Sequence, residues 1–457
     1  MKRVLIANRG EIAVRIIRAC RDLGLETVAV YSTADKDALH VLLADQAVCI
    51  GPGPAPESYI NIPRILSAIE ISGADAVHPG YGFLSENADF ARQCEKGGIT
   101  FIGPSSEAID RLGNKVEAKK IATEAKAPVV PGRIEAFFEP NEALEESRNI
   151  GYPVVLKARS GGGGKGIHIL FDEHHFSEKF YQAQQEAKKS FGDDALYVEK
   201  FIQNPRHIEV QILADHHGNV LHLFERDCTT QRRRQKLIEE APSPVLTPQE
   251  RNYVTQAAVR LCKKAGYNSV GTVEFLFDQT RTFYFMEVNT RIQVEHCVTE
   301  ELTGIDLIKE QIKVACGQKL SLIQDDIEMR GNVIEFRINA EDPKKNFLPS
   351  PGKMELFQPP LGPNIRMDTH SFAGYTIPPY YDSMIAKLIV KGKNREEALL
   401  VAKRALREFF VAPNKTTIPF HQFLIENEEF VENRLTINTI DRWIEEGLLR
   451  EQEPALL

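Results

Sequence analysis

Two glutamates in neighbouring apolar segments have the spacing to bind a divalent cation together. Glu274 and Glu287 lie in segments that predict the two strands of a hairpin, and pairing Asp278 with Phe283 across its turn places the two carboxylates opposite each other. Asn289 follows Glu287 on the same face, because side chains alternate along a strand. Two opposed carboxylates repel each other, whereas two carboxylates and an amide oxygen suit a hard divalent cation.

The alternative for this pair is a solvated face without a ligand. The predicted strands, Thr272–Asp278 and Thr282–Asn289, carry apolar residues on both faces. A strand that is buried on both sides should not carry two free acids. The pattern therefore favours a metal site.

A run of glycines lies between two further predicted strands, Pro153–Ala158 and Ile167–Phe171. Residues 159–166 read Arg-Ser-Gly-Gly-Gly-Gly-Lys-Gly. Glycines let main-chain N–H groups approach phosphate oxygens closely, and Lys165 adds charge. The alternative is a flexible hairpin turn, but four consecutive glycines exceed what a turn needs. No Lys-Ser or Lys-Thr opens a helix here, so the run predicts a loop over phosphates and not a P-loop.

Lys157 ends the apolar strand that precedes the glycines. A lysine in such a strand is costly to bury unless it is paired. The alternative is a charged residue that protects a sheet edge. Its position next to the glycine run favours a phosphate ligand.

Polar residues at alternate positions follow the acidic hairpin, in Arg291-Ile292-Gln293-Val294-Glu295-His296. Glu295 has the chemistry of a general base and Arg291 that of an anion clamp. The alternative is a surface strip of salt bridges. The basic run over residues 232–236 could bind a nucleic acid or a local anion. Glu239 and Glu240 beside it and the acidic composition of the chain disfavour nucleic-acid binding, so the run predicts a local anion site. His207 and Arg337, each taken alone, fit a structural role.

Strands and helices alternate over the first hundred residues. Strands are predicted near residues 4–7, 26–31, 47–50, 74–78 and 100–102, with helices at 11–23, 60–72 and 88–96. This order predicts a parallel sheet covered on both faces. The first turn lacks the GxGxxG spacing of dinucleotide-binding proteins. A helix and linker over residues 114–130 lead to a small lobe near 132–202. A strand-rich block follows this lobe. Its further strands are predicted near 208–214, 221–225, 332–339 and 384–390, and its helices near 249–265, 395–410 and 418–427.

Composition narrows the class of protein. The 457 residues predict two to four domains at roughly 100–200 residues each. Acidic residues outnumber basic ones by 64 to 56, which disfavours a general nucleic-acid binder. The seven cysteines form no CxxC pair, so neither a disulfide scaffold nor a structural zinc site is expected. No signal peptide or membrane span is evident, and we expect a cytoplasmic protein.

These segments together resemble the biotin carboxylases, which are ATP-grasp enzymes, over nearly the whole chain to about residue 447. The motifs that carry the resemblance are Ile6-Ala7-Asn8-Arg9-Gly10-Glu11-Ile12-Ala13, His78-Pro79-Gly80-Tyr81-Gly82-Phe83-Leu84-Ser85-Glu86-Asn87, the glycine run, Glu225-Arg226-Asp227-Cys228, residues 287–296, Arg337-Ile338-Asn339-Ala340-Glu341-Asp342 and Pro378-Pro379-Tyr380-Tyr381-Asp382-Ser383-Met384. Four positions depart from the commonest pattern of that family: Asn114 replaces aspartate, Cys297 replaces proline, Phe336 replaces cysteine, and Arg234 stands where some relatives have histidine.

The resemblance implies an α/β fold with a Rossmann-like N-terminal domain over residues 1–113 and a helical linker over 114–131. An ATP-grasp lid would span 132–202, the C-terminal ATP-grasp and biotin carboxylase C domain 203–447, and a tail 448–457. ATP would lie between the lid and the C-terminal domain, and the lid would close over it.

The resemblance also implies roles for individual residues. ATP contacts would come from Lys115, Lys157, Gly162, Gly163, Gly164, Lys165, Gly166, Glu199, Lys200, Ile202, His207, Gln231, Arg234, Glu274 and Glu287. Magnesium or manganese would be bound by Glu274, Glu287 and Asn289. Bicarbonate would be surrounded by Lys236, Arg291, Gln293, Val294 and Glu295, with Glu295 as the base that deprotonates it. Arg337 would stabilise the enolate form of biotin.

The implied reaction is the ATP-dependent carboxylation of biotin through carboxyphosphate. No Met-Lys-Met biotinylation site is present, so we expect the biotin carboxyl carrier protein and the carboxyltransferase subunits to be separate chains, and the enzyme to be a homodimer. Acetyl-CoA carboxylase, which serves fatty acid synthesis, is the expected assembly, with a pyruvate or propionyl-CoA carboxylase as the alternative. Two further alternatives are another ATP-grasp ligase, which joins a carboxylate to an amine, and a catalytically dead nucleotide-binding regulator.

Overall fold

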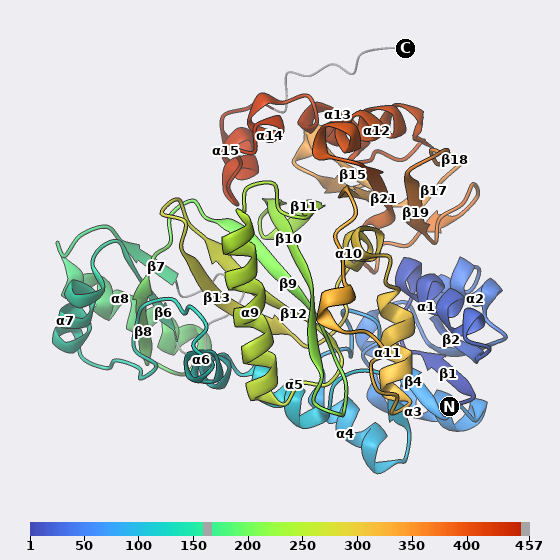
Figure 1. Ribbon diagram of the computed structural model, residues 1–457, viewed down its shortest axis with the longest axis horizontal. Helices are drawn as coiled ribbons and strands as arrows, with labels where there is room; N and C mark the ends of the chain where they lie inside the picture. The colour runs from blue at the N-terminus through green and yellow to red at the C-terminus, as the bar shows by residue number, and fades with distance from the viewer. Residues whose placement is uncertain (159–166, 449–457) are drawn as a thin grey trace.

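The computed structural model describes residues 1–158 and 167–448, which build three larger sheets and the helices that cover them (Figure 1). The first sheet is parallel, with the strand order β3-β2-β1-β4-β5, as the alternating pattern predicts. Its elements are β1 (Arg3–Ile6), α1 (Gly10–Asp22), β2 (Glu26–Ser32), α2 (Leu39–Leu43), β3 (Gln46–Gly51), α3 (Ile62–Ser72), β4 (Ala76–His78), α4 (Ala88–Lys96), β5 (Thr100–Phe101) and α5 (Ser106–Gly113).

The second sheet is a small antiparallel one that projects from the rest of the molecule, at the left of Figure 1. After α6 (Lys115–Glu124), it consists of β6 (Val154–Ala158), β7 (Ile167–Leu170) and β8 (Leu196–Lys200) with α7 (Pro140–Ile150) and α8 (Phe176–Phe191). This part has its own hydrophobic core, in which Leu156, Phe180 and Val198 are fully buried. The predicted phosphate loop lies in residues 159–166, outside the described residues.

The third sheet is antiparallel, has eight strands and forms the middle of the molecule. In order across the sheet, its strands are β13 (Phe283–Asn289), β12 (Val270–Phe277), β9 (Arg206–Ala214), β10 (Val220–Arg232), β11 (Gln235–Ala241), β14 (Asn332–Asn339), β21 (Met384–Gly392) and β19 (Ile365–Thr369). Helix α9 (Pro248–Ala265) packs on it; Thr247 and Glu250 form a capping box at its start, and Gly266 ends it in the left-handed conformation.

The β12–β13 hairpin brings Glu274 opposite Glu287, but by a different register from the predicted one. Phe277, and not Asp278, pairs with Phe283. A β-bulge between the Phe275–Phe285 pair and the Glu274–Glu287 pair then supplies the missing residue. The opposition of the two acids is confirmed, and the assumed pairing at the turn is wrong.

The basic run also differs from expectation, because it is part of a hairpin. Strand β10, predicted to end at Glu225, continues to Arg232, and β11 begins at Gln235. Arg233 and Arg234 form the turn between them with φ angles of 46° and 67°. This turn places Lys236 in the third sheet, where the sequence pattern alone predicted no strand.

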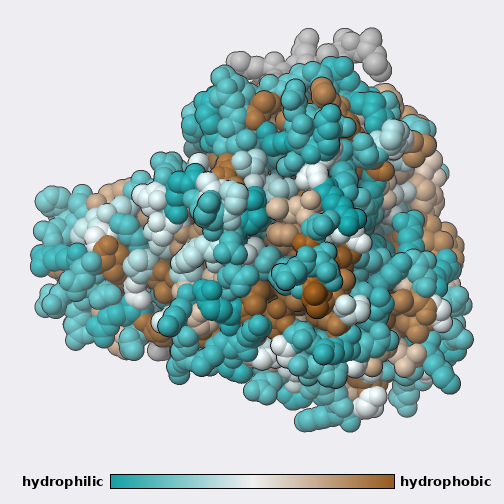
Figure 2. Space-filling view, in the orientation of Figure 1, coloured by the Kyte–Doolittle hydropathy of each residue, from teal (hydrophilic) through white to brown (hydrophobic). Residues whose placement is uncertain are grey.

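The remaining helices complete the C-terminal half. They are α10 (His296–Thr303), α11 (Leu307–Ala315), α12 (Arg395–Glu408), α13 (Ile418–Leu424), α14 (Glu428–Val431) and α15 (Thr439–Glu445). Short strands connect them: β15 (Glu341–Asp342), β16 (Leu348–Pro349), β17 (Gly352–Lys353), β18 (Leu356–Gln358), β20 (Thr376–Ile377) and β22 (Phe410–Ala412). Hydrophilic side chains cover most of the face in Figure 2. Within residues 1–158 and 167–448, no helix combines the length and the apolar character needed to cross a membrane.

Buried histidines predict a loss of stability in mild acid. Burial lowers the pKa of His78, His296 and His370 to about 3 and that of His40, His222 and His421 to about 4, from a usual value of 6.5. The unfolded chain binds these protons at the ordinary pKa, so the contribution of the histidines to the free energy of unfolding should be highest above about pH 6.5 and fall toward pH 4, by about 1.4 kcal/mol per pH unit for each proton. Urea unfolding from about pH 7 to pH 5 measures the slope. The variant His370→Gln should reduce it, and an unchanged slope would contradict the assignment.

Candidate active site

One cavity of about 1690 Å³ is lined mainly by the second sheet, helix α6 and the third sheet, with Tyr81 from the N-terminal part. It is larger than the roughly 300–1,000 Å³ of an ordinary ligand pocket and has room for more than one substrate. Its lining includes every predicted site residue that the structure describes: Lys115, Lys157, Glu199, Lys200, Ile202, His207, Gln231, Arg234, Lys236, Glu274, Glu287, Asn289, Arg291, Gln293, Val294, Glu295 and Arg337. The predicted Gly162, Gly163, Gly164, Lys165 and Gly166 lie outside the described residues.

A row of charged side chains crosses four strands on the cavity side of the third sheet. Glu274 pairs with Glu287 on one side and with Glu209 on the other, and Glu209 pairs with Arg226. Arg226 is fully buried and donates to Glu209 and, at 2.8 Å, to Gln293. Three carboxylates side by side repel one another, so the row requires cations from other elements.

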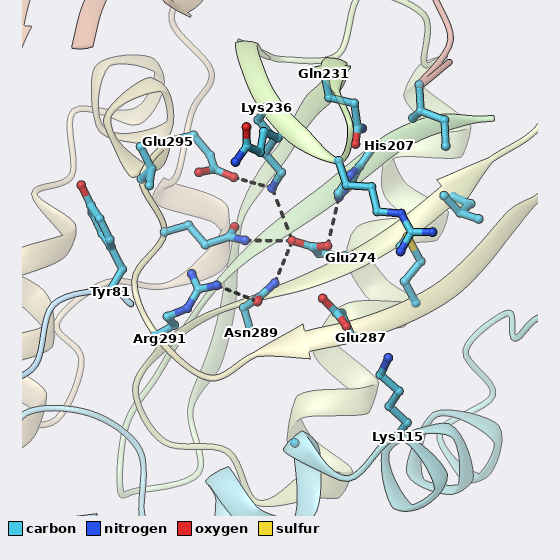
Figure 3. Close-up of a pocket in the computed structure, with 18 of the residues that line it drawn as sticks. Tyr81, Lys115, His207, Gln231, Lys236, Glu274, Glu287, Asn289, Arg291 and Glu295 are labelled. Carbon is cyan, nitrogen blue, oxygen red and sulfur yellow. Dashed lines mark hydrogen bonds and ion pairs between the residues drawn. The ribbon is translucent and has the colours of Figure 1, made fainter. Parts of the chain in front are cut away.

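Glu274 is held by several donors, whereas Glu287 is not (Figure 3). Glu274 accepts hydrogen bonds from Asn289 at 2.7 Å and Gln293 at 2.8 Å, and its other oxygen lies 3.1 Å from the ring of His207. Among the described residues, none forms a hydrogen bond or ion pair with Glu287. The side chain of Lys115 points toward it from α6 in Figure 3.

The charge states of this pair fit a divalent cation. Burial raises the pKa of Glu274, but Lys236 and His207 lower it more, so it lies well below its usual range. Burial and the neighbouring Glu274 raise the pKa of Glu287. An unpaired carboxylate beside an ionised one, with the oxygen of Asn289 on the same strand, is the donor set that Mg²⁺ or Mn²⁺ prefers.

Lys236 is the cation at the centre of the cavity. Its ammonium group lies 2.5 Å from Glu295, 2.6 Å from Glu209 and 3.4 Å from Glu274. Burial alone lowers the pKa of Lys236, but its acidic neighbours raise it well above the usual value. The side chain is therefore charged and can attract a small anion to the space beside Glu295.

Glu295 is a buried carboxylate held between two cations. Arg337 donates to it at 2.9 Å and Lys236 contacts its other oxygen. Burial raises the pKa of Glu295, but Lys236, Arg337 and Arg226 lower it well below the usual range. Glu295 is thus ionised and able to accept a proton. Arg337 also donates to Glu239 at 2.6 Å, and burial raises the pKa of Glu239 to about 7.

Arg291 faces the same space and is not part of a solvated strip. It donates at 2.9 Å to Glu86 of the N-terminal part. It also donates at 3.0 Å to Asn289, and this bond is drawn in Figure 3. These two bonds fix the guanidinium group at the edge of the acidic row. Its position suits an anion clamp.

The second sheet and helix α6 together contribute a separate group of charges. Lys157 and Lys119 lie 2.5 Å and 3.0 Å from Glu199. Lys200 donates to the carbonyls of Gly151 and Tyr152 at 2.8 Å and 3.0 Å, so its ammonium group is already engaged by the main chain. The lysines of this group and the Glu274–Glu287 pair of the third sheet line the same cavity. Together they suit a polyphosphate that carries a bound cation.

Several residues that shape the site were not predicted from the sequence. Glu209 follows His207 by two positions in a strand, and this alternation was a usable signal. Glu86 lies in a motif that carries the resemblance. Lys119 lies one helical turn after Lys115, on the same face of α6. Glu239 was considered only as a neighbour of the basic run, because the strand that buries it was not predicted.

Three family descriptions match successive parts of the chain. Residues 1–109 match "Biotin carboxylase, N-terminal domain", residues 114–323 match "Carbamoyl-phosphate synthase L chain, ATP binding domain", and residues 335–442 match "Biotin carboxylase C-terminal domain". Together they span most of the chain.

Relatives and solved structures agree with this match. The chain is 54% identical to Biotin carboxylase 1 of Bacillus subtilis over 97% of its length and 99% of the relative's. It is 49% identical to a pyruvate carboxylase subunit of Methanothermobacter thermautotrophicus, over 96% and 90%. The biotin carboxylase domain dimer of 2-oxoglutarate carboxylase from Hydrogenobacter thermophilus, solved with MgADP, ADP and bicarbonate, superposes with a TM-score of 0.90 at 46% identity and 99% coverage of both chains.

Proposed function

The chain belongs to the biotin carboxylase family, and from this premise we propose that it uses ATP to activate bicarbonate and transfers the carboxyl group to biotin on a carrier protein. The observation that carries the proposal is the placement of an ionised Glu295 between Lys236 and Arg337, in the same cavity as the Glu274–Glu287 pair. A base, an anion site and a cation site within one cavity are what bicarbonate phosphorylation requires.

The phosphoryl transfer depends on positioning and charge. Lys115 and Lys157 line the cavity where the ATP phosphates would lie, and Glu274, Glu287 and Asn289 would hold Mg²⁺ or Mn²⁺. When bound, the metal ion neutralises charge that develops on the transferring phosphoryl group. The remaining predicted nucleotide contacts, His207, Glu199, Lys200, Ile202, Gln231 and Arg234, surround the same space.

Glu295 acts as the base because its cations can be shared with the substrate. Bicarbonate placed beside Lys236, Arg291, Gln293 and Val294 competes with Glu295 for the charge of Lys236, which raises the proton affinity of the carboxylate. Glu295 then accepts the bicarbonate proton while bicarbonate oxygen attacks the γ-phosphorus, and ADP leaves. The products of this step are carboxyphosphate and ADP.

Arg337 serves the second step. Carboxyphosphate breaks down to carbon dioxide and phosphate, and the phosphate takes the N1 proton of biotin. The ureido oxygen of biotin becomes anionic, and the fixed guanidinium of Arg337 stabilises that charge. The nitrogen then attacks carbon dioxide to form carboxybiotin.

For the assembly, we propose a homodimer that works with a separate biotin carboxyl carrier protein and carboxyltransferase subunits as an acetyl-CoA carboxylase of fatty acid synthesis. The relative named Biotin carboxylase 1 supports the biotin carboxylase role, and the structure from Hydrogenobacter, a biotin carboxylase domain dimer of 2-oxoglutarate carboxylase, supports the homodimer. The Methanothermobacter relative, whose name is that of a pyruvate carboxylase component, supports a pyruvate carboxylase as the second candidate. Proteins that copurify with the tagged chain, together with its mass in sedimentation, distinguish the two and test the dimer.

We also propose a cytoplasmic location. The seven cysteines are free thiols, and Cys49 and Cys316 are exposed. Exposed thiols persist best in a reducing compartment. Cell fractionation tests the location.

The activity is tested by ATP cleavage with free biotin as acceptor. We expect ADP release that requires bicarbonate and magnesium, and carboxybiotin that forms only with all substrates. ATP cleavage that depends on an amine and not on bicarbonate would identify another ATP-grasp ligase. Nucleotide binding without any cleavage would identify a regulator.

A further inference from the structure

A buried lysine outside the cavity contacts the segment that lines it. Lys387 lies on β21, is fully buried, and donates a hydrogen bond of 2.8 Å to the carbonyl oxygen of Val294. Val294 and Glu295 line the cavity, whereas Lys387 does not. The lysine therefore contacts this segment from the side that faces away from the cavity.

The contact orients a peptide plane. Lys387 fixes the carbonyl of Val294, and the ring of His296 donates to the carbonyl of Gln293 at 2.8 Å. In a trans peptide the N–H points opposite to the C=O. Two consecutive peptide units thus have their carbonyls held by buried donors, and among the described residues none accepts from the N–H of Val294 or Glu295. These N–H groups are therefore available to bind a ligand.

Lys387 is charged and joined to the N-terminal part. Its ammonium group lies 3.1 Å from Glu11, which accepts a hydrogen bond from the hydroxyl of Tyr81, a residue of the cavity wall. Burial lowers the pKa of Lys387, but Cys297 and Glu11 raise it well above the usual value. The thiol of Cys297, 3.1 Å from the ammonium group, donates in turn to Asp368 at 3.0 Å.

We propose that Lys387 is a positioning residue for bicarbonate: by holding the Val294 carbonyl, it sets the place of Glu295 and of the main-chain N–H groups that face the anion. This inference rests on the proposed function, because bicarbonate is the anion assigned to the space beside Glu295. The lysine touches no substrate and acts only through the segment that it holds. Its loss should therefore change the handling of bicarbonate and leave ATP binding unchanged.

The test compares Lys387→Met with Lys391→Met in the bicarbonate-dependent ATP cleavage assay. Lys391 is the matched control, because it lies on the same strand and donates at 2.6 Å to another main-chain carbonyl, that of Glu301, away from the cavity. A displaced loop should raise the KM for bicarbonate ~10-fold or more in Lys387→Met, with the KM for ATP unchanged. Lys391→Met should keep both KM values.

A second variant distinguishes loss of the positioning role from unfolding of the protein. Lys387→Met leaves Glu11 buried without its cation, and breaking a buried ion pair in this way is costly. The double variant Glu11→Gln/Lys387→Met removes both charges and should show the same rise in the KM for bicarbonate. A folded Lys387 variant with a normal KM for bicarbonate overturns the inference. Unfolding of every Lys387 variant also overturns it, because the role of Lys387 is then structural. A wild-type enzyme without bicarbonate-dependent cleavage refutes the proposed function instead.

Discussion

Replacing Glu287 with glutamine should lower turnover ~10²-fold or more, because the change removes charge from the metal site and keeps the shape of the side chain. In the structure this carboxylate has no partner among the described residues, so its charge is available to a cation. Glu274 is held by Asn289, Gln293 and His207 and would remain in place. The loss should be accompanied by a higher magnesium requirement, measured by titrating the metal at saturating ATP and bicarbonate.

The control is a variant that loses one carboxylate outside the cavity. Glu124 lies on α6 in an exposed ion pair of 3.1 Å with Lys264, so Glu124→Gln removes one carboxylate without touching the cavity. This variant should keep wild-type turnover. Normal turnover and a normal magnesium dependence in Glu287→Gln would refute the assignment of Glu287 to the metal.

Glu295→Ala and Arg337→Ala should separate the two steps of the reaction. Without Glu295, the carboxylate assigned as the base is missing, because Glu209 and Glu274 beside Lys236 belong to the acidic row of the sheet. Both ATP cleavage and biotin carboxylation should therefore be lost. A guanidinium cannot act as the base, so Arg337→Ala should keep much of the bicarbonate-dependent ATP cleavage while losing carboxylation of biotin. The second loss should reach ~10²-fold or more, as for removal of one donor from an oxyanion site.

Both residues are buried in ion pairs, so folding and ATP binding need a control. Arg395 donates to Glu240 at 2.7 Å, next to the pair formed by Arg337 and Glu239, but it does not line the cavity. Arg395→Ala removes a partly buried arginine whose side chain is 14% exposed, against 16% for Arg337, and should keep carboxylation. Normal carboxylation by Arg337→Ala would refute the enolate role. Bicarbonate-dependent ATP cleavage by Glu295→Ala would mean that another group is the base.

The sequence was sufficient for features that depend on local pattern. The alternation of strands and helices predicted the parallel N-terminal sheet, and an assumed pairing of Asp278 with Phe283 predicted that Glu274 opposes Glu287. The assumed turn pairing was off by one residue, and the bulge at Met286 cancelled the error. A bulge depends on packing from both sides of the sheet, which a single strand's pattern does not contain.

Features that depend on neighbouring strands were not predicted. Glu209, Glu239 and Glu335 are all fully buried acids, and their surroundings come from strands far away in the sequence. The run that contains three consecutive arginines predicted a local anion site, but its pattern did not show that the chain turns there between two strands. Lys387 was overlooked because one lysine in an apolar strand says nothing about the carbonyl that it meets.

The second sheet has a hydrophobic core of its own, and this has a consequence for how the protein melts. Lys157 and Glu199 lie on that sheet, while Glu274 and Glu287 lie on the third one. Without a ligand, each core can lose its structure separately, so unfolding need not be a single cooperative transition. A nucleotide that contacts both walls binds only when both are folded, and its binding free energy is then added to the stability of each. A substrate that contacts both walls should therefore make the two cores unfold together, and the contacts that position the phosphates should make the enzyme more resistant to heat and proteolysis.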